Sequence, residues 1–116
     1  MTMGTAPSMT MAWIWLIIAA LAEVGWVLLM KASDGFTRLW PSVAFVAVLA
    51  LSMFGLATAA RTIPVGTAYA VWTGFGAVAI ALIGIAWFGE PGTALRIGCI
   101  ALILAGIAGL KLTSPA

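Results

Sequence analysis

One carboxyl group in this chain lies where an ionised side chain is costly. Glu23 falls near the middle of an apolar run, between Leu21-Ala22 and Val24-Gly25. An ionised side chain at the centre of a bilayer costs on the order of 3 kcal/mol even on the lenient insertion scale. An acid in a membrane span is therefore a functional candidate, because such acids line cavities and proton pathways. Glu23 can hold a proton or exchange it for a cation. Since one site cannot hold both, each ligand must displace the other.

Aromatic and hydroxyl side chains are available to complete a cation site around this acid. Trp26 follows Glu23 by three residues, a spacing that places both on one helix face. Tyr69 and Trp72 have the same spacing in a later apolar run, and Ser52 is a lone hydroxyl near the middle of another. Charge, cation–π contact and hydrogen bonding from these groups favour a site for an organic cation.

Simpler roles for the same residues stay open at this point. Glu23 can be a protonated carboxyl that only locks helix packing. Trp26 and Tyr69 lie near span ends and can belong to the aromatic belt at the membrane interface. Ser52 can bond to its own helix instead of orienting Glu23. Four further tryptophans are expected in that belt: Trp13, Trp15, Trp40 and Trp87.

The composition restricts the class of protein that can present these residues. Of 116 residues, 65% are hydrophobic and 7% are charged, and there is no histidine. A soluble domain has roughly a quarter of its residues charged, so the chain is expected to lie in a membrane. With Cys99 as the one cysteine and no second acid in any span, neither a metal site nor an enzyme is expected. The four runs leave no room for a nucleotide-binding loop, and no nucleic-acid partner is expected.

Four apolar runs predict an all-α integral membrane protein with four transmembrane helices. Each run is long enough to cross the roughly 30 Å hydrocarbon core as a helix. The runs are about 12–30, 41–60, 66–88 and 93–110, within one domain of residues 12–111. Residues 1–11 are expected to be a disordered lead-in and residues 112–116 a C-terminal tail. The first run is not expected to be a cleaved signal peptide, because no Lys or Arg precedes it.

Small residues indicate a hinge in the third run and a packing face in the fourth. Gly74 and Gly76 lie in the middle of the third run, where glycine weakens a helix but permits a kink or close packing. The fourth run has small residues spaced so that another helix can approach closely. The candidate dimer-packing residues are Gly98, Ala101, Ala105 and Gly109.

The basic residues predict no preferred orientation. Arg61 and Lys111 belong to the side that holds both termini, and Lys31, Arg38 and Arg96 belong to the other. The positive-inside rule needs a bias to fix topology, so such a chain can insert both ways and pair antiparallel. Four helices of this length enclose little space, which places a solute pathway between two protomers.

Three segments together resemble the small multidrug resistance family, over the chain from residue 11 to 111. They are residues 22–24 (AEV), 31–38 (KASDGFTR) and 64–74 (PVGTAYAVWTG). Within the family, the sequence is similar to the guanidinium exporter subtype. The residues that indicate this branch are Trp72-Thr73-Gly74, Trp26, Glu90-Pro91 and Gly109-Leu110-Lys111.

The resemblance implies an antiparallel, dual-topology homodimer in a bacterial inner membrane that exchanges protons for guanidinium. Such a transporter would need no cofactor, because the proton gradient is its energy source. Its partners would be the cation, protons, membrane lipid and a second copy of the chain. Glu23 would match the carboxylate that protons and substrate share, and Gly74 and Gly76 the kink of the third helix. The positions that would line or buttress the site are Trp26, Ser52, Tyr69 and Trp72.

Two other functions remain open beside this reading, and a heteromeric pair remains open in place of the homodimer. The first is a polyspecific exporter of quaternary ammonium and other lipophilic cations, and the second is a non-transporting assembly or packing subunit. A planar guanidinium can donate two N–H groups to one carboxylate, whereas a quaternary ammonium has none to donate. Ser52 beside Glu23 would suit guanidinium by orienting the carboxylate. Two positions differ from the guanidinium branch, since Ala20 replaces its usual glycine and Gly25 its usual valine.

Overall fold

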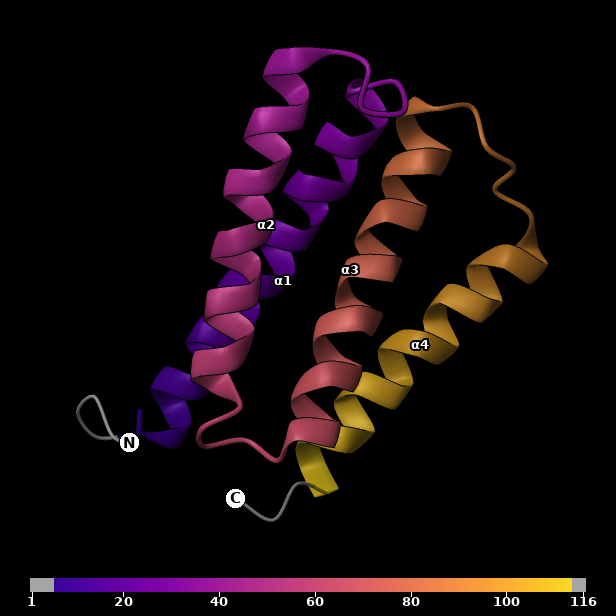
Figure 1. The fold of residues 1–116 in the computed structure, drawn as a ribbon. Helices are drawn as coiled ribbons and strands as arrows, with labels where there is room; N and C mark the ends of the chain where they lie inside the picture. The colour runs from indigo at the N-terminus through magenta and orange to yellow at the C-terminus, as the bar shows by residue number, and fades with distance from the viewer. Residues whose placement is uncertain (1–5, 114–116) are drawn as a thin grey trace.

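The computed structural model of the protein describes residues 6–113 and consists of four long helices joined by short connections (Figure 1). Each helix is long and apolar enough to cross a membrane. The helices are α1 (Met9–Ala32), α2 (Leu39–Ala59), α3 (Val65–Trp87) and α4 (Ala94–Thr113). The predicted all-α fold with four candidate spans is thus confirmed, and both ends of the described chain lie at the same end of the bundle (Figure 1).

The helix ends differ from the predicted ends by up to three residues. Ser8 is the N-cap of α1, and its hydroxyl accepts a hydrogen bond of 3.2 Å from the Met11 backbone N–H. The expected lead-in of residues 1–11 is therefore wrong for residues 9–11, which form the first turn of α1. Likewise, residues 112–113 of the expected tail belong to α4. Residues 6–8 precede the helix, and the rest of both segments, residues 1–5 and 114–116, lies outside the described residues.

A tight turn reverses the chain between α1 and α2. The Ser33 hydroxyl donates to the Met30 carbonyl at 2.6 Å and accepts from the Phe36 N–H at 3.0 Å. Asp34, Gly35 and Phe36 have φ angles of 51°, 72° and 64°. Only glycine adopts this left-handed region at no steric cost. The Ser33 bonds therefore hold a backbone conformation that two of these residues would otherwise avoid.

The first three helices share a core of small side chains. At Gly55 of α2, an added Cβ would lie 3.0 Å from the Ala19 Cβ and 3.2 Å from the Trp15 carbonyl oxygen. Small residues let helix backbones approach closely in lipid, where van der Waals contact replaces the hydrophobic driving force. The other fully buried members of this core are mostly alanines (Ala12, Ala20, Ala59 and Ala68), together with Leu16, Ile63 and Val71.

α4 stands apart from this core. Figure 1 shows α4 close to α3 near its C-terminal end and diverging from it toward the α3–α4 connection. In the close part, a Cβ added at Gly74 would lie 3.1 Å from Ile107 Cδ1 and 3.3 Å from Ile103 Cγ2. Within the described chain, Ile100 is the one buried residue of α4. Most of this helix therefore presents its side chains outward.

Candidate functional site

Glu23 projects from α1 onto the backbone of α3. A Cβ added at Gly76 would overlap the Glu23 carboxyl group and lie 3.2 Å from its Cγ. The Oε1 atom is buried and has no hydrogen-bond partner among residues 6–113. Glu23 is also the one acidic residue within the described helices. A buried acceptor without a partner is costly, and binding of a proton or a cation would relieve that cost.

Ser52 connects three helices one turn away from Glu23. Its hydroxyl is fully buried, donates to the Ala19 carbonyl of α1 at 2.7 Å and accepts from the Trp72 indole N–H of α3 at 3.0 Å. Ala19 precedes Glu23 by four residues and shares its helix face. The hydroxyl thus bonds neither to its own helix nor to Glu23, the two roles considered from the sequence. It fixes the position of an aromatic ring instead.

Tyr69 extends the group formed by Ser52 and Trp72. The Tyr69 and Trp72 ring centroids lie 5.8 Å apart with an interplanar angle of 43°. Trp72 is only 7% exposed, whereas Tyr69 is 56% exposed. The structure therefore brings together three of the predicted residues, Ser52, Trp72 and Tyr69. The Ser52 hydroxyl is the buried end of this group, and the Tyr69 side chain is its exposed end.

Trp26 packs against an aromatic ring of α2. The Trp26 and Phe45 ring centroids lie 5.8 Å apart, with an interplanar angle of 84°. The Phe45 centroid in turn lies 5.0 Å from that of Phe36 in the α1–α2 turn. The Trp26 Nε1 is buried without a hydrogen-bond partner in the described part of the chain. Trp26 is thus the inner end of an aromatic row that leads to the turn, a connection that its spacing from Glu23 does not reveal.

The two central glycines of α3 serve close packing in this conformation. α3 is one uninterrupted helix from Val65 to Trp87. Gly76 admits the Glu23 carboxyl, and Gly74 admits two isoleucines of α4. Close packing was one of the two uses expected for these glycines, and their role as a hinge stays a prediction.

The two positions that differ from the guanidinium branch lie in packed surroundings. Ala20 is fully buried in the core of the first three helices. At Gly25, an added Cβ would lie 3.3 Å from Val48 Cγ1, so this glycine allows α2 to approach α1. Gly25 therefore faces α2, whereas the Glu23 carboxyl rests on α3.

The small residues of α4 have no partner surface within the described chain. A Cβ added at Gly98 or Gly109 would meet nothing within 4 Å. Ala101 and Ala105 are exposed as well. This face is thus uncovered within the described chain, and its role in dimer packing stays a prediction.

Four helices that are long and apolar enough to cross a membrane, with the Glu23 Oε1 atom buried among them, define the class as a multi-pass membrane protein. The profile of the family described as Small Multidrug Resistance protein matches residues 11–103. This chain belongs to that family, and the resemblance seen in its motifs is confirmed.

Bacterial relatives match the chain over nearly its whole length. A protein named "Guanidinium exporter" from Yersinia pseudotuberculosis serotype I (strain IP32953) is 54% identical over 104 residues, which cover 90% of this chain and 100% of the relative. Proteins of the same name from Citrobacter freundii and from Escherichia coli (strain K12) are each 51% identical over 104 residues, covering 90% of this chain and 99% of the relative.

Proposed function

We propose that this chain exports guanidinium and substituted guanidinium cations across the bacterial inner membrane in exchange for protons. The names of its relatives support the substrate. The observation that supports the mechanism is the Glu23 Oε1, which is buried in a span without a hydrogen-bond partner among the described residues. A proton and a cation would occupy this carboxyl in turn, so that release of one allows binding of the other.

Each residue of the site would make a different contribution to binding of the cation. A planar guanidinium donates two parallel N–H groups to the Glu23 carboxylate. The rings of Trp72, Tyr69 and Trp26 offer cation–π surfaces. Ser52 acts through Trp72, because its hydroxyl is engaged with the Ala19 carbonyl and the Trp72 indole. Its role is to hold the ring in place one helical turn from the carboxylate.

The transporting unit that we propose is an antiparallel homodimer of subunits inserted in both orientations. The outward small-residue face of α4 supports such a pairing. The near-even split of basic residues between the two ends supports insertion both ways. Tyr69, which is exposed in the single chain, would then face the second copy. The two Glu23 carboxyls would titrate as a coupled pair.

Uptake into proteoliposomes under a pH gradient tests this function. We expect Glu23→Gln to abolish both guanidinium uptake and coupled proton movement, while cross-linking still detects the dimer. The matched control is Glu90→Gln, the same substitution at an exposed carboxyl outside the spans, which lies 3.4 Å from the Arg96 guanidinium. It should transport as the wild type does. Substantial pH-driven transport by the Glu23 variant would refute the assignment.

Competition for pH-driven uptake, at a fixed concentration of guanidinium, distinguishes between the candidate substrates. Tetramethylammonium cannot donate the hydrogen bonds that the Glu23 carboxylate accepts. Such a charge-assisted bond contributes about 1.5–3 kcal/mol, so we expect tetramethylammonium to compete about tenfold to a hundredfold more weakly than guanidinium. Equal competition would favour the polyspecific exporter. Absence of uptake for both cations would favour the packing subunit.

A further inference from the structure

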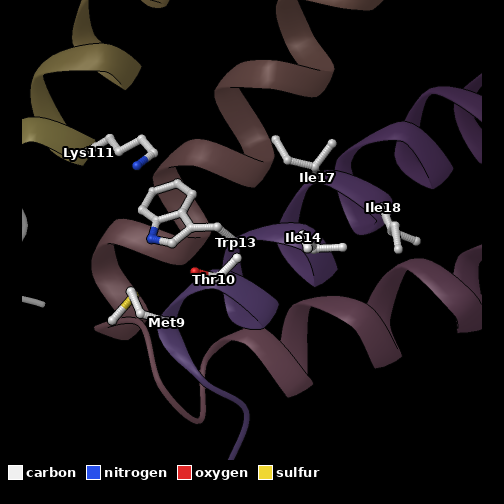
Figure 2. Close-up of a pocket in the computed structure, with 7 residues that line it drawn as sticks. All are labelled: Met9, Thr10, Trp13, Ile14, Ile17, Ile18 and Lys111. Atoms are coloured by element: carbon white, nitrogen blue, oxygen red, sulfur yellow. The ribbon is translucent and has the colours of Figure 1, made fainter.

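A groove separate from the candidate site runs between the first half of α1 and the end of α4. Its volume is about 470 Å³. Figure 2 shows Lys111, Trp13, Thr10 and Met9 toward one end of the groove, and Ile17 and Ile18 toward the other, with Ile14 between them. The groove therefore has a polar end and an apolar end.

The polar end lies at the outer ends of two candidate spans. Thr10 belongs to the first turn of α1, and Lys111 to the last turn of α4. The Lys111 Nζ lies 4.8 Å from the Trp13 ring centroid, a cation–π contact that holds the amino group over the groove. From Thr10, α1 rises about 12 Å to Ile18 at 1.5 Å per residue. An amino group and a hydroxyl thus stand above a strip of apolar side chains.

The apolar strip is open to the lipid phase in the single chain. Ile14, Ile17 and Ile18 are 46%, 40% and 39% exposed. Their side chains offer a wall for a hydrocarbon chain that lies along α1.

The chain supplies no acidic side chain at this end of the bundle. Its three acids are Glu23, Asp34 and Glu90, and none occurs in residues 1–22 or 91–116. Asp34 and Glu90 lie in the connections at the opposite end, where Lys31 is also found. No side-chain carboxylate at this end of the bundle is therefore available to Lys111, and basic pockets between membrane helices suit anionic headgroups.

We propose that this groove binds an anionic phospholipid. The lipid phosphate would contact the Lys111 amino group and the Thr10 hydroxyl, and one acyl chain would lie along the strip of isoleucines. A lipid of this kind matches both ends of the groove. The small-residue face of α4 from a second copy would match only the apolar end, which is the reason to prefer the lipid.

Native mass spectrometry of the purified full-length protein tests the proposal. The protein is titrated with phosphatidylglycerol or with phosphatidylcholine of the same acyl chains, and the lipids retained on each oligomer are counted. We expect preferential retention of phosphatidylglycerol. Lys111→Gln should lower the affinity for phosphatidylglycerol about fivefold and leave that for phosphatidylcholine unchanged. Ile14→Trp, which fills the groove, should lower the retention of both lipids.

The matched control is Lys31→Gln. Lys31 also lies in the last turn of its helix and over an aromatic ring, 5.0 Å from the Phe88 centroid, but it shares its end of the bundle with two acids. We expect it to retain phosphatidylglycerol as the wild type does. If Lys31→Gln and Lys111→Gln lowered the affinity for phosphatidylglycerol equally, the result would show only a general attraction between charges and would overturn the proposal. Equal retention of the two lipids by the wild type would also overturn the proposal. So would an Ile14→Trp variant whose dimer fraction falls while its retention of phosphatidylglycerol stays unchanged.

Discussion

Replacing Gly76 by alanine tests whether the close approach of α3 sets the position of the Glu23 carboxyl group. The added Cβ would overlap the carboxyl and would also lie 3.2 Å from the Glu23 Cγ. Because Cγ lies near the root of the side chain, turning the carboxyl group alone does not relieve the contact. The Glu23 side chain must adopt another rotamer, which moves the carboxyl away from its place on α3.

The expected effect falls on substrate affinity and not on folding. Forcing an extra carbon into a packed site costs about 1–3 kcal/mol when the neighbours cannot move, and here a side chain can move. Alanine also favours a helix interior over glycine by about 1 kcal/mol. A displaced carboxylate, however, loses a charge-assisted hydrogen bond to guanidinium, about 1.5–3 kcal/mol. We therefore expect the KM for guanidinium to rise about tenfold to a hundredfold.

Guanidinium uptake into proteoliposomes under a fixed pH gradient measures this KM. The control is Gly66→Ala in the same helix, where an added Cβ meets nothing within 4 Å, and its KM should not change. A wild-type KM in Gly76→Ala would refute the reasoning from the contact. A lower kcat at unchanged KM would instead indicate that Gly76 acts as a hinge.

Three further expectations concern the helix connections, the orientation and the dimer. Ser52→Ala leaves the Trp72 indole N–H buried without its acceptor, so we expect a loss of about 1–3 kcal/mol in stability and a lower Tm; an unchanged Tm would contradict this. A reporter fused to the C-terminus should be found on both sides of the membrane, and added lysines beside Arg61 should fix one orientation and reduce transport. A single orientation of the unmodified protein with transport intact would rule out dual topology. Ala105→Leu should lower the cross-linked dimer fraction, because it adds bulk to the small-residue face of α4; an undiminished fraction would exclude this face from the interface.

The number and type of the helices could be predicted because each apolar run is as long as a bilayer is thick and the connections are short. The start of α1 at Met9 was harder to predict, since it depends on a hydrogen bond that the Ser8 hydroxyl accepts from the Met11 backbone N–H. Helix ends of this kind are decided by capping geometry and not by hydropathy.

The residue types of the candidate site could be predicted, but their contacts between helices could not. Spacing places Glu23 and Trp26 on one helix face, yet it does not say which helix that face meets. The acceptor of the Ser52 hydroxyl is the Ala19 carbonyl, and a backbone carbonyl has no signature in the sequence. The contact of Gly76 with Glu23 depends on the rotation of α1 and α3 about their axes, which packing alone determines.

The outward placement of α4 has a consequence for the conditions under which the protein is studied. Lipid tails are as apolar as the side chains of this helix, so removal from water does not hold it in place. Within the described chain, Gly74 of α3 allows Ile103 and Ile107 of α4 to pack close to it. If a second copy orders the rest of α4, as proposed, that order follows mass action. Dilution of the protein with lipid should then loosen the fourth helix while the first three keep their packing.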